Sequence, residues 1–257
     1  MSKAVQKKDS TELMLDDLEG MEGFGAEFSK DETAIPFVKI LQSMSPQCKK
    51  AEDEYVEGAE EGDLFHTVLN KSYKKMYFIP CRFQHTLIQW KNREQGGGFV
   101  AAYEVNDPAK PRTERQGNKD VCLDDPESYL ENTMQYISLV YDEEGNELGP
   151  AVLSFKSSGL KYARRFNASL SAKKLRTSAG KEFRAPIFSH LYELTTMPER
   201  NDQGSWFSYK IGEGQVIKNP EALKEAMSFS KNLAEDKKVF VEQPDDVAPE
   251  QDQTLEI

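Results

Sequence analysis

Apolar and polar positions alternate along several stretches of the chain, and this alternation is typical of strands with one buried face. The clearest stretch is Met76–Lys91, MYFIPCRFQHTLIQWK, which is rich in aromatic and β-branched residues. Pro80 cannot donate to a sheet ladder, so it predicts an edge position or a bulge. The glycines at 96–98 predict a hairpin tip that leads into a further strand over 99–105.

The remaining pattern predicts more strands and two helices. Apolar residues at 160, 163, 166 and 170 recur at helical spacing, after Ser157 and Ser158 as a plausible N-cap. A second amphipathic helix is predicted over 221–233, entered through Asn219 and Pro220. Polar stretches 106–125 and 171–184 predict loops. Strands are predicted over 64–69, 133–141, 150–156, 187–196 and 205–211, while 35–44 fits either a strand or a helical turn.

This order of elements predicts an α+β protein that is mainly β. Strands, one intervening helix, a hairpin and a closing helix fit an OB-fold-like, partly open barrel over residues 35–234. Residues 1–34 and 235–257 are acidic, with net charges of −5 and −6, and account for the whole net charge of −11. Low hydrophobicity and high charge predict that both ends are flexible. The acidic C-terminal end is expected to occupy the protein's own basic groove or to recruit partner proteins.

Positive charge gathers in one segment of this acidic protein. Residues 155–184 hold nine basic residues and one acid, Glu182. Such a local field attracts polyanions, of which nucleic acid is the commonest. A solvated basic helix is the alternative. The basic residues are Lys156, Lys161, Arg164, Arg165, Lys173, Lys174, Arg176, Lys181 and Arg184.

Aromatic residues lie beside some of the basic ones, as expected of proteins that bind single strands by stacking on bases and contacting phosphates. Trp90 precedes Lys91 and Arg93. Trp206 shares a predicted strand face with Lys210, opposite the apolar Phe207, Tyr209 and Ile211, so both tryptophans are expected to reach solvent or ligand. Tyr162 follows Lys161. The stacking candidates are Trp90, Trp206 and Tyr162, with Phe83 and Phe99 as weaker ones.

Several functional classes lack support in the sequence. His66, His85 and His190 are far apart and share no metal-ligand spacing, and no nucleophile or phosphate-loop motif is present, so we expect no enzymatic activity, cofactor or metal. The three cysteines form no CxxC pair, which predicts a cytosolic protein rather than a disulfide framework. No apolar run is long enough to cross a membrane.

Four segments carry a resemblance to a known family: FVKILQSMSP, FIPCRFQHTLIQW, SFKSSGLKYARRFN and GSWFSYKI. The chain resembles, from about residue 35 to 233, phage-encoded single-stranded DNA-binding proteins of replication and recombination. The resemblance implies an OB-like core, a location in the host cytoplasm, and an acidic tail that contacts other replication proteins. The chain ends in acidic residues but lacks the DDDIPF-type tip of bacterial single-strand binders.

The leading hypothesis is sequence-tolerant binding and protection of single-stranded DNA. One alternative is a strand-annealing protein or a nuclease accessory factor. Another is a structural or takeover protein that binds a host protein through its acidic ends. Self-association, site size and preference for DNA over RNA stay open.

Overall fold

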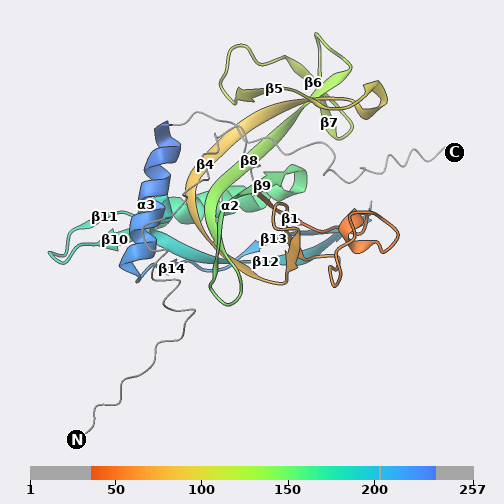
Figure 1. The fold of residues 1–257 in the computed structure, drawn as a ribbon. Coiled ribbons are helices and arrows are strands. Elements are labelled where there is room, and N and C mark those ends of the chain that lie inside the picture. Colours follow the sequence, from red (N-terminus) through yellow and green to blue (C-terminus); the bar gives the residue numbers. More distant parts are fainter. Residues whose placement is uncertain (1–35, 203, 236–257) are drawn as a thin grey trace, which may run out of the picture. The chain divides into compact units, whose positions relative to one another are not determined.

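The computed structural model describes residues 36–202 and 204–235, which all belong to one compact unit beginning at Ile35. The predicted acidic ends therefore lie outside the described residues, apart from Glu235. Two long antiparallel strands form the centre of the unit, β4 (Met76–Lys91) and β8 (Ser128–Tyr141), and they pair along nearly their whole length (Figure 1).

Further strands extend this pair on both sides into one curled sheet. The order is β13-β12-β4-β8-β9-β1-β2-β3, with β14 on β12. β1 and β9 run parallel, and the other neighbouring pairs on this path are antiparallel. The bounds are β1 (Phe37–Ile40), β2 (Leu64–His66), β3 (Lys71–Tyr73), β9 (Glu147–Lys156), β12 (His190–Asn201), β13 (Gly204–Ile211) and β14 (Gln215–Val216).

Pro80 lies at a bulge. The sequence predicted either an edge position or a bulge for this residue. The register between β4 and β8 shifts between Pro80 and Arg82. A proline inside a central strand is tolerated there because the bulge removes the need for its missing N–H.

The far ends of β4 and β8 carry three smaller strands, β5 (Phe99–Glu104), β6 (Thr113–Gln116) and β7 (Lys119–Cys122). β5 pairs with β4 as predicted, whereas β6 and β7 form a hairpin in the segment predicted as a loop. That prediction was wrong because the strands are short and polar. β6 is fully exposed, so it has no apolar face to reveal it.

The curled sheet forms a half-barrel whose opening is bridged by side chains. The Gln42 amide donates to the Phe207 carbonyl at 2.9 Å and accepts from the Phe207 N–H at 2.8 Å. The Tyr209 hydroxyl donates to the carbonyl of Val38. The end strand β13 is therefore joined to β1 and to the segment after it without a continuous ladder. The predicted OB-like, partly open barrel is confirmed as the fold class.

Helix α2 (Leu160–Ala172) lies against one face of the sheet, called here the inner face (Figure 1). Phe166 is 6% exposed, and its ring lies 5.1 Å from that of Tyr136 and 4.8 Å from that of Tyr192, centroid to centroid. The serines predicted as an N-cap belong instead to a short 3₁₀ helix, η3 (Ser157–Gly159), and Gly159 occupies the cap position without a side-chain bond.

Helix α3 (Pro220–Glu235) lies against the opposite face, called the outer face. Ala226 and Leu233 pack there with Ile79, Ile137 and Val152. Short 3₁₀ helices complete the unit: η1 (Pro46–Cys48), η2 (Arg93–Gln95) and η4 (Ile187–Ser189). Within residues 36–202 and 204–235, no helix has the length and apolar character needed to span a bilayer.

Candidate nucleic-acid interface

Helix α2 carries the first group of predicted contact residues on its solvent side. Arg164 and Arg165 are exposed, and neither forms an ion pair with a described residue. Tyr162 is half-buried, with Lys161 Nζ 4.8 Å and Arg165 Cζ 5.8 Å from its ring centroid. These cation–π contacts hold two cations beside one ring. Tyr162 also packs against the inner core, so only part of its surface faces solvent.

Glu199 of β12 neutralises one of the predicted cations. Lys161 donates to the Glu199 carboxylate, which also accepts from the Ser208 hydroxyl. Burial opposes ionisation of Glu199, but the bonds from Lys161 and Ser208 outweigh it, and its pKa lies below the usual value. The bond to Glu199 raises the pKa of Lys161. Lys161 therefore ties the start of α2 to the sheet and has less charge to offer a ligand.

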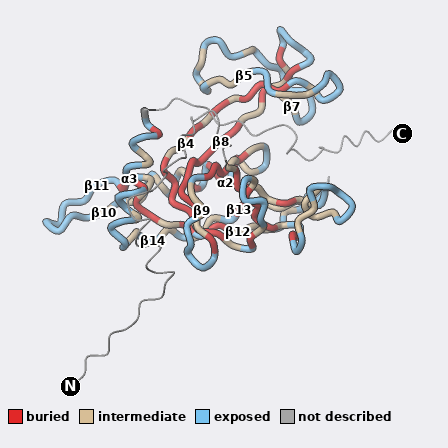
Figure 2. The backbone as a smooth tube through the Cα atoms, viewed as in Figure 1, coloured by how far each residue is buried: buried red, intermediate tan, exposed pale blue. Residues whose placement is uncertain are grey.

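The rest of the basic segment is a two-stranded ribbon rather than the predicted loop. β10 (Lys174–Arg176) pairs with β11 (Glu182–Arg184), directly after α2. The ribbon extends away from the sheet and is exposed along most of its length (Figure 2). The loop prediction was wrong because each strand has only three residues and the charge hides their alternation.

The ribbon has one charged face and one apolar face. Lys174 lies opposite Arg184, and Arg176 lies opposite Glu182, so these four side chains share a face. Glu182 pairs with Arg176 at 2.7 Å and with Lys174 at 3.7 Å. Arg184 donates to the Ser171 hydroxyl at 3.0 Å, which links the ribbon to α2.

The other face of the ribbon pairs Leu175 with Phe183, which is 42% exposed. Sequence reasoning missed Phe183. An apolar ring exposed between charged neighbours in a basic segment is the signal that could have found it. Lys181 is exposed near the tip. Lys173, at the base of the ribbon, lies 5.7 Å from the Tyr192 ring centroid.

Lys173 also acts on the neighbouring His190. Burial lowers the pKa of His190, and the positive charge of Lys173 lowers it further. His190 is buried beside Ser189, whose Oγ lies 2.7 Å from its Nδ1. Its position is that of a core residue at the start of β12.

Trp90 is not on the surface, so the expectation that it reaches solvent or ligand is wrong. It is 5% exposed on the outer face of β4, and its Nε1–H donates to Glu131 at 3.1 Å. Glu131 also pairs with Lys156 at 3.3 Å. Alternation along β4 turns Trp90 toward this half-buried pair, while Lys91 pairs with Glu127 at 3.8 Å and Arg93 is exposed in η2. Four predicted contact residues therefore belong to β4, η2 and β9 and not to the ribbon: Trp90, Lys91, Arg93 and Lys156.

The other aromatic candidates divide between surface and core. Trp206 is half-buried and lies opposite Glu199 on the β12–β13 hairpin, near the start of α2, while Lys210 is exposed on the same strand. Phe83 packs against Tyr136, 5.3 Å between centroids. Phe99 is 48% exposed and packs edge-to-face with Trp90, with 6.1 Å between ring centroids. Trp206 and Phe99 can be reached by solvent; Phe83 belongs to the inner core.

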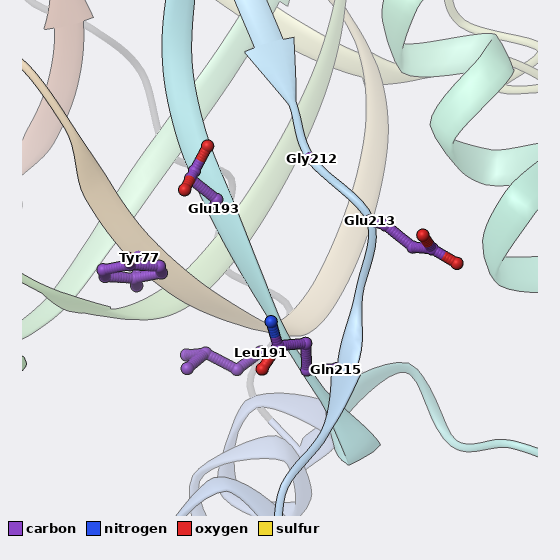
Figure 3. Close-up of a pocket in the computed structure, with 6 residues that line it drawn as sticks. All are labelled: Tyr77, Leu191, Glu193, Gly212, Glu213 and Gln215. Carbon is purple, nitrogen blue, oxygen red and sulfur yellow. The ribbon is translucent and has the colours of Figure 1, made fainter.

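A hollow of about 260 Å³ lies elsewhere, beside β12 and β14. Its lining includes Glu193 and Glu213, which point in different directions (Figure 3). Two carboxylates repel a phosphate group, so this hollow is a poor site for nucleic acid. In the described part of the chain, no group of three or more His, Cys, Asp or Glu side chains could hold a metal ion.

Comparison with protein families gives a match over residues 5–239. The chain belongs to the Pam3 phage gp34-like protein family. This confirms the phage part of the resemblance, and the family's description says nothing about DNA binding. Neither the curated proteins nor the solved structures gave a match.

Proposed function

We propose that this phage protein binds single-stranded nucleic acid, with DNA of phage replication or recombination as its ligand, and does so without catalysis. One observation supports the proposal most: α2 and the β10–β11 ribbon follow each other in the chain and present a run of exposed cations. Four of these have no acidic partner among residues 36–202 and 204–235, namely Arg164, Arg165, Lys181 and Arg184.

The charge distribution supports a polyanion as the ligand. Glu182 is the one acid within 155–184 and already has two basic partners. A phosphate backbone would supply the missing counter-charges and release its condensed cations. The surface groups are arginines and lysines, whose N–H groups donate to phosphate oxygens, and the planar arginine fork matches phosphate geometry.

Single strands fit better than duplex because one half-buried and one exposed aromatic ring, Tyr162 and Phe183, lie in the basic segment. Tyr162 lies beside Arg165 on α2, and Phe183 precedes Arg184 in β11, on the opposite face of the ribbon. Unpaired bases can stack on such rings, each with a gain of about 1–3 kcal/mol. Paired bases are stacked on each other and cannot do so.

The proposal predicts tighter binding of oligo-dT than of a duplex of equal length. Fluorescence anisotropy of labelled oligonucleotides across a salt series measures both affinities. Log affinity for oligo-dT should fall linearly with log salt, with a slope of about −0.7 for each phosphate neutralised.

Equal affinity for duplex and single strand would remove the stacking argument. No binding at low salt would refute the proposal. Faster formation of duplex from complementary strands in the presence of the protein would favour strand annealing over protection.

A further inference from the structure

Helix α2 begins without the features that normally stabilise the N-terminus of a helix. Gly159 occupies the cap position without a side-chain hydrogen bond, and the first turn contains no acidic residue. Instead, Lys161, Arg164 and Arg165 place three positive charges within the first two turns. The positive end of the helix dipole repels such charges. The start of α2 therefore needs stabilisation from outside the helix.

Glu199 of β12 supplies the negative charge that the first turn lacks. It lies 38 residues after Lys161 in the chain. Its Oε2 accepts from Lys161 Nζ, and its Oε1 accepts from the hydroxyl of Ser208 on β13. The Tyr162 hydroxyl also hydrogen-bonds to this carboxylate. One side chain thus joins the first turn of α2 to both strands of the β12–β13 hairpin.

The Glu199 carboxylate is shielded from solvent. Its side chain is 14% exposed, and Ser208 is 5% exposed. Ion pairs in full contact with water contribute little because solvent and salt screen them. A shielded carboxylate that accepts hydrogen bonds on both oxygens is held more firmly in one geometry. The contact therefore helps to fix the Tyr162 ring, beside which Lys161 and Arg165 lie.

We propose that Glu199 is a positioning residue for the nucleic-acid surface of α2, an inference that rests on the function proposed above. Glu199 holds Lys161 and Tyr162 so that the exposed part of the ring and the neighbouring cations contact the same strand. An acid also repels a phosphate backbone, but at about 8 Å in water this repulsion changes the affinity only about twofold. The order that Glu199 imposes outweighs it, because hydrogen bonds to a charged group are stronger than neutral ones.

Glu199→Gln tests the proposal, with Glu193→Gln as a control that has the same change in charge. Glutamine has one acceptor oxygen and one amide donor, so it cannot accept from both Lys161 and Ser208. Glu193 is exposed on the same strand and lines the hollow beside β14. We expect Glu199→Gln to weaken oligo-dT binding about three- to tenfold. Glu193→Gln should leave the affinity within about twofold of the wild type.

Hydrogen exchange followed by mass spectrometry gives a readout that needs no nucleic acid. In Glu199→Gln, amides of residues 160–170 should exchange about three- to tenfold faster, while amides of β4 and β8 keep their rates, because the loss of order is local. Ser208→Ala removes one donor and keeps the ion pair, so it should produce a smaller change in the same direction. It also serves as the test variant if Glu199→Gln fails to fold.

Three results would overturn the proposal: unchanged exchange over residues 160–170, an equal increase in β4 and β8, or tighter oligo-dT binding by Glu199→Gln. The last result would make Glu199 a repulsive charge and not a positioning residue. Failure of the proposed function is a separate result, since it would appear as wild-type protein that does not bind oligo-dT. Normal binding by the wild type that Glu199→Gln leaves unchanged would refute only the role of Glu199.

Discussion

Phe166→Ala is expected to lower the free energy of unfolding by about 3–5 kcal/mol, the usual loss when a buried phenylalanine is truncated. Phe166 joins α2 to the inner face through the rings of Phe78, Tyr136 and Tyr192. Removing the ring leaves a cavity among three aromatic partners that cannot easily collapse. Urea unfolding followed by circular dichroism measures the change.

Ser169→Ala is the matched control, because Ser169 is exposed on the same helix. It should change the unfolding free energy by less than about 0.5 kcal/mol. A loss below about 1 kcal/mol for Phe166→Ala would mean that α2 is not anchored by this ring. The basic residues of α2 would then lack the fixed position on which the proposed interface depends.

Charge removal at Arg164 and Arg165 is expected to weaken oligo-dT binding about 10- to 100-fold at 50 mM salt. Two lost phosphate contacts should flatten the salt slope by about one to two units, so the loss should nearly vanish at 1 M salt. The double variant Arg164→Gln, Arg165→Gln is measured by anisotropy across a salt series, with its melting temperature checked in parallel.

Lys224→Gln with Lys231→Gln gives a control with the same change in net charge. Both lysines are exposed on α3, against the other face of the sheet. This variant should keep the salt slope within about half a unit. If the arginine variant binds more weakly at every salt concentration with an unchanged slope, the arginines support the fold and do not contact phosphate.

The fold could be predicted where an element buries one face, because burial imposes a regular spacing of apolar residues along the sequence. Met76–Lys91 matches β4 residue for residue, and the helices and the β12–β13 hairpin were expected close to their observed positions. The prediction was wrong for β6–β7 and for the β10–β11 ribbon. These strands are three or four residues long and mostly exposed, so backbone pairing rather than a buried face defines them.

The candidate site was harder to predict because it depends on which face of a strand or helix each side chain lies on. Trp90 and Lys91 are adjacent in sequence, yet alternation sends them to opposite faces of β4. Trp90 is buried against Glu131, and Lys91 reaches Glu127. Lys161 looks like a free cation until β12 brings Glu199 beside it. Phe183 lies between charged neighbours in the sequence, and its place opposite Leu175 follows from the pairing of β11 with β10.

Photocrosslinking of the full chain to oligo-dT carrying 5-iododeoxyuridine tests the central claim most directly. The modified base reacts with aromatic side chains that stack on it, and peptide mass spectrometry locates the adducts. The account predicts adducts within residues 160–184, at Tyr162 or Phe183. Adducts confined to Trp90 and Phe99, or to peptides of α3 and β12, would contradict it and move the nucleic-acid surface to another face of the sheet.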